Sequence, residues 1–195
     1  ENSKHFNARY TDSAFALGSL EVKGFYSDMQ KRFPFTRFDT LVNNQVYYSG
    51  NPANPQADFA QTTLYSKRAG ITATVETALD VLREGSTLTW GADFVHDDTS
   101  QRLENGWAVI SPMTQNSIAG CAQLEVPVTE RLQVQGGVRY ERYFLNIEDF
   151  RRPAIYYINR PYPAIDVLGG SFDYDNWTFN LGGTFELSPG LQLFG

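Results

Sequence analysis

Arginine and tyrosine side chains are concentrated between residues 146 and 171 of this 195-residue chain. A guanidinium group pairs with a carboxylate through a fork of two hydrogen bonds, and a tyrosine ring offers a stacking surface together with a hydroxyl group. These residue types suit an anionic ligand that has flat aromatic parts. The candidates here are Arg151, Arg152, Tyr156, Tyr157, Arg160 and Tyr162.

Two other stretches between regular segments carry the same residue types. Residues 29–61 and 99–116 contain further arginine and aromatic side chains. Loops often carry the binding residues of a protein, although most loop residues bind nothing, so ligand contact by each candidate is a hypothesis. The candidates in these stretches are Arg32, Arg37, Tyr47, Tyr48, Arg102 and Trp107.

Catalysis or metal binding would need a cluster that the sequence does not offer. His96 precedes two aspartates, but His5 is the only other histidine, and no arrangement of nucleophile, base and orienting group is visible. Cys121 is the only cysteine, so neither an intrachain disulfide nor a thiolate cluster can form, and we expect a small packed residue there. We therefore predict no enzymatic activity, no bound metal and no cofactor.

The segments that position these loops alternate apolar and polar residues. Leu88, Trp90, Ala92 and Phe94 occupy one register of the clearest segment, and polar or small residues fall between them. Side chains on a strand point to opposite faces with a period of two, so each segment has one apolar and one polar face. The strands that we expect are 4–13, 19–28, 62–78, 86–97, 117–126, 131–144, 172–187 and one that starts at Leu191.

The gaps between these strands alternate between short and long. Tight turns are expected at 14–18, 79–86, 127–131 and 188–190, and long connections at 29–61, 99–116 and 146–171. Short turns on the periplasmic side and long loops outside the cell are typical of a transmembrane β-barrel. The alternation of short and long gaps thus predicts a location in the bacterial outer membrane, with every arginine- and tyrosine-rich stretch on the extracellular side.

The polar register carries many ionisable side chains. Burying them unpaired in a soluble core would be very unfavourable, whereas a wide barrel encloses water or a plug. The net charge of −6 argues against nucleic acid as a partner. The residues expected to face the lumen are Arg9, Glu21, Lys23, Thr74, Glu76, Asp93, Gln123, Glu125, Gln133, Gln135, Arg139, Glu141, Asn180 and Glu186.

Three segments resemble the barrel of TonB-dependent outer-membrane receptors of the ferric-siderophore type: Leu88–Phe94, Leu132–Tyr140 and Phe179–Gly195. The resemblance implies an all-β, antiparallel up-and-down barrel of 22 strands, of which residues 1–195 would supply about eight. It also implies energy-coupled import of a ferric siderophore. The implied partners are the TonB complex, acting through a plug and TonB box absent from this chain, and outer-membrane lipid and lipopolysaccharide.

Two other interpretations remain open at this stage. One is a different outer-membrane barrel, either a porin-like channel or a barrel enzyme, and the other is a soluble β-sandwich that serves as a binding module. The chain starts at Glu1 without the basic and apolar regions of a signal peptide, so we expect it to be part of a longer protein. The flanking sequence would discriminate among the three interpretations.

Overall fold

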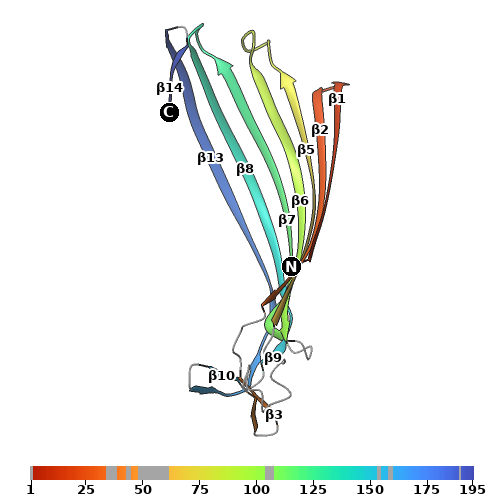
Figure 1. Ribbon diagram of the computed structural model, residues 1–195. Coiled ribbons are helices and arrows are strands. Elements are labelled where there is room, and N and C mark those ends of the chain that lie inside the picture. The colour runs from red at the N-terminus through yellow and green to blue at the C-terminus, as the bar shows by residue number, and fades with distance from the viewer. Residues whose placement is uncertain are drawn as a thin grey trace.

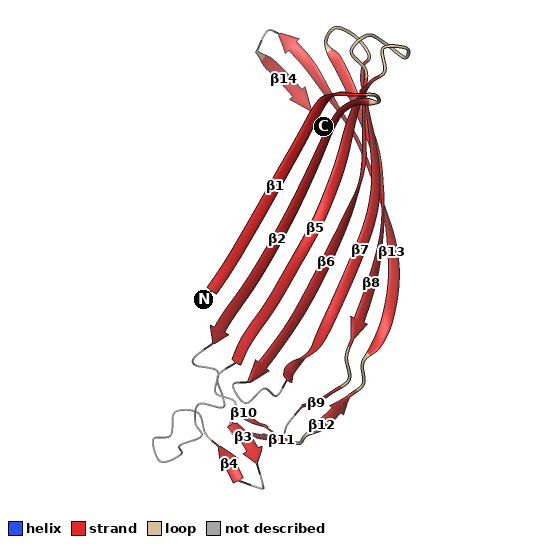
Figure 2. Cartoon of the chain, turned by 90° about the vertical axis from the view of Figure 1, so that its right-hand side faces the viewer, coloured by secondary structure: helices blue, strands red, loops and turns tan. Residues whose placement is uncertain are grey.

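Eight strands form a single curved antiparallel sheet (Figures 1 and 2). The computed structural model describes residues 2–33, 39–42, 45–47, 62–103, 108–152, 155–157, 160–188 and 190–195. Each strand pairs with the next one along the chain in the order β1-β2-β5-β6-β7-β8-β13-β14, with β1 and β14 at the two edges. The strands are β1 (Asn2–Phe15), β2 (Gly18–Phe33), β5 (Thr62–Ala78), β6 (Thr87–Leu103), β7 (Ala108–Pro127), β8 (Leu132–Ile147), β13 (Gly170–Ser188) and β14 (Leu191–Phe194).

The predicted up-and-down architecture is confirmed, and so are the tight turns. Gly18, Gly85 and Gly190 adopt positive φ angles of 131°, 80° and 84° in three of them. At Gly18 the space is also closed, because a Cβ atom there would lie 2.1 Å from the backbone oxygen of Glu76. The β1–β2 turn therefore needs glycine for both its backbone angle and its close approach to β5.

The predicted long connection over 99–116 is wrong. β6 continues to Leu103 and β7 begins at Ala108, so the two strands form a tall hairpin. The strands β2, β8 and β13 also extend past their predicted loop-side ends. Alternation disappears beyond Val95 because both registers become polar, but the backbone hydrogen bonds continue without needing an apolar face.

The two faces of the sheet have opposite chemistry along whole cross-strand rows. Residues paired directly across neighbouring strands lie on the same face. One row is apolar throughout: Val22, Ala73, Ala92, Gly120, Tyr140 and Trp177. The next row is mostly polar: Lys23, Thr72, Asp93, Ala119, Glu141 and Asn176.

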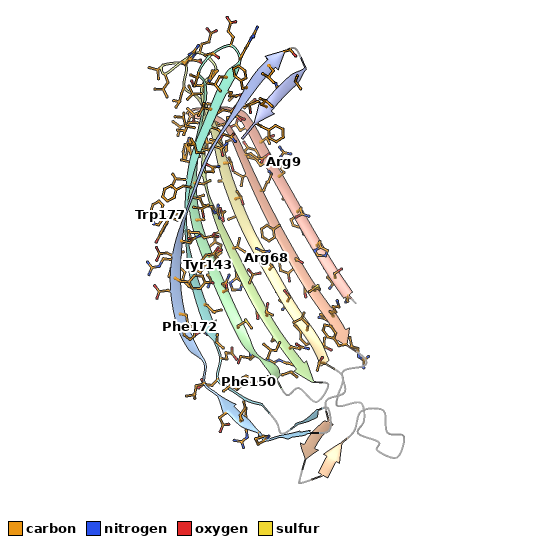
Figure 3. All side chains as sticks on the ribbon, turned by 90° about the vertical axis from the view of Figure 1, so that its left-hand side faces the viewer. Arg9, Arg68, Tyr143, Phe150, Phe172 and Trp177 are labelled. Atoms are coloured by element: carbon orange, nitrogen blue, oxygen red, sulfur yellow. The ribbon has the colours of Figure 1, made fainter. Side chains whose placement is uncertain are left out.

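The apolar face is the outward one, and it is open to its surroundings. Trp177 is 56% exposed and Leu181 is 84% exposed, although both are large apolar residues. Figure 3 shows Trp177 on the outer side of the arc and Arg68 and Tyr143 on its inner side. A solvent-exposed apolar face of this extent would be unstable in water, whereas lipid chains can cover it.

The apolar band has the height of a bilayer core. On β7 it runs from Val126 to Ile118 and is followed by Asn116, and on β6 it runs from Leu88 to Phe94 and is followed by His96. At about 3.3 Å per residue and a tilt of about 40°, this corresponds to roughly 18 Å on β6 and roughly 23 Å on β7, slightly less than the ~25 Å band of outer-membrane barrels. The strands continue beyond the band at their loop-side ends. None of the described residues belongs to a helix long and apolar enough to cross a bilayer.

An arginine scan of neighbouring positions tests the two faces. Leu124 lies in the apolar band, one outward position from its turn-side end at Val126, in the row that contains Leu88, Gly136 and Leu181, whereas Gln123 lies on the polar face. In the complete barrel refolded in lipid, Leu124→Arg should lower the free energy of unfolding by about 1–2 kcal/mol, because the cost of a lipid-facing charge is about 2–4 kcal/mol at the bilayer midplane and falls toward the interfaces. Gln123→Arg should cost much less. Equal losses at the two positions, measured by denaturant titration, would contradict the assigned faces.

Candidate functional site

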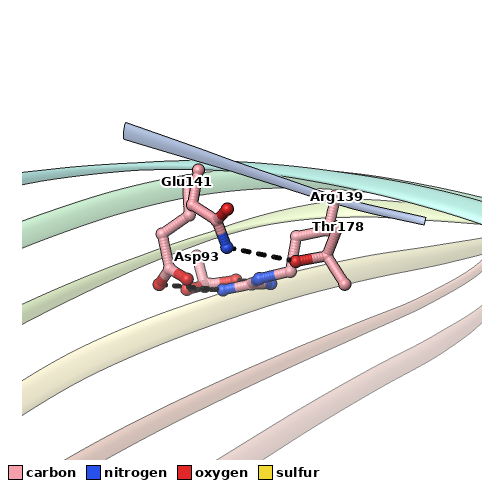
Figure 4. A network of polar contacts seen from close by, with 5 residues as sticks. Asp93, Arg139, Glu141 and Thr178 are labelled. Carbon is pink, nitrogen blue, oxygen red and sulfur yellow. Dashed lines mark hydrogen bonds and ion pairs between the residues drawn. The ribbon is translucent and has the colours of Figure 1, made fainter. Parts of the chain in front are cut away.

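Arg139 is the centre of a charged network on the inward face (Figure 4). Its Nη1 and Nη2 atoms lie 2.8 Å and 3.2 Å from the two carboxylate oxygens of Asp93. Nη2 also lies 3.2 Å from Oε1 of Glu141. The Asp93 contact is the two-pronged arrangement in which arginine and carboxylate fit best. One cation thus holds two carboxylates in fixed positions on the barrel wall.

The network forms because the strand between its partners carries small residues. Asp93 lies on β6 and Arg139 on β8, and between them β7 presents Ala119 and Cys121. Ala119 is only 3% exposed because the charged side chains cross over it. Contacts that skip a strand occur on the concave side of a curved sheet, where side chains converge. The network therefore also identifies the polar face as the inner one.

Toward the short turns, the inner wall continues as a chain of hydrogen-bonded amide side chains. Nδ2 of Asn180 lies 3.4 Å from Oε1 of Gln123, and Nε2 of Gln123 lies 3.4 Å from Oε1 of Gln135. Asn180 crosses over Gly137, where a Cβ atom would lie 2.4 Å from the Asn180 side-chain oxygen. A cavity of about 270 Å³ lies here beside Arg139, lined also by the Cys121 side chain. Its lining includes two amide side chains, Gln123 and Asn180, and the Arg139 guanidinium, although most of the lining surface is apolar.

Toward the loops, the inward face becomes aromatic. Tyr143 and Tyr174 stack with their ring centres 4.8 Å apart and their planes at 15°. On the other side of the arc, Phe25 lies over Gly70, and the Arg68 guanidinium is 5.7 Å from the Phe25 ring centre. Aromatic rings thus face the lumen on the loop side of the Arg139 network. Arg68, beside the Phe25 ring, is itself paired with Asp97.

The two longest predicted loops meet in one small sheet. Strands β3 (Asp39–Val42), β4 (Gln45–Tyr47), β10 (Ile155–Tyr157) and β11 (Arg160–Tyr162) pair in the order β11-β10-β3-β4 beyond the loop-side ends of the long strands (Figure 2). We call this four-stranded unit the loop sheet. It holds the candidates Tyr47, Tyr156, Tyr157, Arg160 and Tyr162. Tyr47 and Tyr162 share a cross-strand row with Thr40 and Ile155.

The remaining candidates are distributed differently. Arg151 on β9 (Phe150–Arg152) has its Nη1 atom 2.9 Å and 3.2 Å from the carboxylate oxygens of Asp166 on β12 (Ile165–Val167), so it links these two short strands. Arg152 pairs through its backbone with Ile165. Arg102 lies on the outward register of β6, opposite Thr63. Arg37, Tyr48 and Trp107 lie outside the described residues.

His96 lies on the outward register of β6, as its place in the alternation predicts. Its Nδ1 atom is 2.8 Å from the side-chain oxygen of Asn116 on β7. Within the described ranges, no group of three or more histidine, cysteine or acidic residues is arranged to hold a metal ion. The histidine thus joins two strands on the side away from the lumen.

A curved up-and-down sheet with a lipid-facing apolar band and a charged inner wall defines an arc of a transmembrane β-barrel. Residues 2–195 match the family of the TonB dependent receptor-like β-barrel. The chain belongs to this family.

Relatives and solved structures agree with this assignment. The chain is 24% identical to the rhizobactin receptor of Rhizobium meliloti strain 1021 over 213 residues, which covers 96% of this chain and 26% of that protein. The closed form of the ferric-catecholate import receptor Fiu from E. coli K12 superposes with a TM-score of 0.69 at 10% identity, over 98% of this chain and 32% of Fiu. The copper transporter OprC gives 0.68 at 10% identity, over 98% and 30%. The chain thus spans about a quarter to a third of these proteins.

A double-mutant cycle on Asp93 and Arg139 tests the inner-wall network. Each single change, Asp93→Asn or Arg139→Gln, should destabilise the complete barrel, and the pair should show a coupling of about 1 kcal/mol. We expect a value at the lower end for a charged pair because the Arg139 side chain is 36% exposed and therefore screened by solvent. Thermal unfolding of all four proteins at low and high salt would measure it. Strict additivity of the two changes would contradict the network.

Proposed function

We propose that the chain is the barrel portion of an energy-coupled importer of a ferric siderophore in the bacterial outer membrane. The observation that carries the proposal is that two sites, the loop sheet and the Arg139 network, follow one another along the direction of the long strands. The loop sheet, which holds four tyrosines and Arg160, lies beyond the loop-side ends of the long strands (Figure 2), and Arg139 holds two carboxylates on the inner wall that these strands form. A ligand caught outside can therefore pass to a polar, water-compatible interior.

The composition of the loop sheet suits an anionic chelate. Iron-binding chelators present catecholate, hydroxamate or carboxylate oxygens around the metal, so their complexes combine negative charge with flat or apolar parts. Tyrosine rings stack on the flat parts, and guanidinium groups pair with the oxygens. Tyr47, Tyr156, Tyr157, Arg160 and Tyr162 are the residues proposed for this contact. No covalent step is involved, so the protein is a transporter and not an enzyme.

The remaining partners belong to the rest of the protein. A plug within the lumen and a TonB box that reaches the TonB complex would release the ligand inward, and both would lie outside residues 1–195. Family membership and the names of its relatives, a rhizobactin receptor and a ferric-catecholate import receptor, support this division of labour. Outer-membrane lipid and lipopolysaccharide would cover the outward face.

A binding panel with the complete receptor tests the proposal. The receptor would be titrated with ferric catecholate, hydroxamate and carboxylate siderophores, and tyrosine and tryptophan fluorescence quenching would report binding. We expect saturable binding of one chemical class, and TonB-dependent uptake of radioactive iron with the same preference in cells. Uptake that proceeds equally without TonB would favour a passive channel and contradict the proposal.

Tyrosine truncations locate the ligand contact. Tyr47→Ala and Tyr162→Ala should each weaken siderophore binding about three- to tenfold, the equivalent of about 0.5–1.5 kcal/mol for one lost aromatic contact. Tyr65→Ala is the matched control, because Tyr65 lies on the outward register of β5. The contact would be misplaced if Tyr65→Ala had the larger effect in the same titration.

A further inference from the structure

The inward face of the sheet is divided into two halves of opposite charge. From the row of Glu21 and Arg139 toward the loops, the described inward-facing residues of β1, β2 and β5 include four arginine or lysine side chains and one carboxylate. Over the same height, those of β6, β7, β8 and β13 include one arginine and three carboxylates. The first set is Arg9, Glu21, Lys23, Lys31 and Arg68, and the second is Asp93, Asp97, Arg139 and Glu141.

The four cations of the first half lie at even steps along the strands, and we call them the cationic wall. Lys31 lies nearest the loops, Arg68 lies in the row of Ser27, and Lys23 lies opposite Arg9. On β2 these rows are four residues apart, so each step is about 13 Å at about 3.3 Å per residue. Figure 3 labels Arg9 and Arg68 on this half of the arc. The series follows the direction in which a ligand would cross the membrane, and it begins on the strand that leads into β3 of the loop sheet.

The two cations nearest the loops each lie beside an aromatic ring. The Nζ atom of Lys31 is 5.5 Å from the ring centre of Phe33, and the Arg68 guanidinium is 5.7 Å from that of Phe25. Phe25 can lie here because Gly70 has no side chain, since a Cβ atom there would lie 2.5 Å from the ring. A cation beside a ring offers an anionic ligand a charge and a flat surface at one place.

Farther from the loops, two cations share one carboxylate. Arg9 and Lys23 both form ion pairs with Glu21. The side chains of Arg9 and Lys23 are 65% and 55% exposed, whereas that of Glu21 is only 23% exposed. The cluster therefore carries a net positive charge, and its cations keep hydrogen-bond donors open to the lumen.

We propose that an anionic ferric chelate crosses the lumen along the cationic wall, from Lys31 and Arg68 to the pair of Arg9 and Lys23. The inference deepens the proposed function and rests on it. A surface of one sign attracts a ligand of the opposite sign, so the cationic half of the arc draws the chelate in and the acidic half repels it. Passage requires sites that bind strongly enough for entry and weakly enough for release, which partly neutralised cations in series provide.

The route also restricts the class of ligand. A ferric ion with three hydroxamate groups is neutral, because each group carries one negative charge, and it gains little from the cationic wall. Catecholate groups carry two negative charges each, so their ferric complexes are anionic, and so are complexes with surplus carboxylates. The cationic wall therefore favours catecholate and carboxylate chelates over neutral hydroxamates.

The test uses the complete receptor in cells that carry TonB, supplied with radioactive iron as a ferric tris-catecholate, as ferric citrate or as a neutral ferric trihydroxamate. Arg9→Gln/Glu21→Gln/Lys23→Gln removes the net charge of the cluster, retains polar side chains and leaves no carboxylate unpaired. Arg9→Lys/Lys23→Arg keeps both charges. The matched controls are Lys4→Gln and Lys67→Gln, which remove cations from outward positions on β1 and β5.

We expect the neutralised triple variant to lower the maximal uptake rate of the anionic chelates about tenfold, because two cations on their route are lost. Equilibrium binding of the same chelates should stay within about twofold of the wild type, since the loop sheet captures them, and this also shows that the variant is folded. Arg9→Lys/Lys23→Arg should retain at least about half of the wild-type uptake rate, because it keeps both charges. Both outward controls should behave as the wild type does.

Several results would overturn the route while siderophore import stands. These are unchanged uptake by the triple variant, an equal loss in Lys67→Gln, and a wild type that imports the neutral trihydroxamate but neither anionic chelate. A loss that is equal for neutral and anionic chelates would show that the cations hold a plug and not the ligand. A loss of binding as large as the loss of uptake would assign them to capture. If the wild type imports none of the three chelates, the proposed function fails and the route fails with it.

Discussion

From β2 to β13, the part of the sheet that forms the apolar band depends on a continuous backbone hydrogen-bond ladder whose two-residue register has no shift. Inside a bilayer no water can satisfy a free amide or carbonyl, so each strand must pair fully with its neighbours. That requirement fixes which residues share a face. A slip of one residue between β7 and β8 would carry Arg139 and Glu141 into lipid and Tyr140 into the lumen. The pairing register therefore decides which residues face the lipid and which face the lumen.

The inner wall shows how the ladder allows charges at membrane depth. Arg139 and Asp93 reach each other only because Ala119 and Cys121 leave room on the strand between them, and Asn180 reaches Gln123 only across Gly137. Small residues at these three positions are thus as necessary as the polar groups. On the outer side, large residues such as Tyr140 and Trp177, whose ring centres are 4.8 Å apart, cover the same strands.

The sequence predicted the strands well and their loop-side ends poorly. β5 has the predicted bounds, and the alternation of Ile71, Ala73 and Val75 with polar residues indicates its two faces. β6 and β7 were predicted too short because polar residues on both faces give no periodic signal. To predict the Asp93–Arg139 pair, one must know how β6, β7 and β8 align across two connections. Alternation of apolar and polar residues indicates the face on which a residue lies, but not which residues lie opposite each other. The loop sheet joins Thr40 to Ile155, and no local pattern encodes a contact between segments so distant in the chain.

The tall β6–β7 hairpin affects how a ligand can reach the lumen. Its two strands stay hydrogen-bonded to within five residues of each other, from Arg102 to Ala108, well above the apolar band. A molecule that first adsorbs on the membrane surface and then diffuses sideways meets a closed wall at this part of the rim. In the proposed importer, capture at this part of the rim would depend on collisions from the bulk medium, so the encounter rate would scale with the free concentration of the ligand and not with its affinity for the membrane surface.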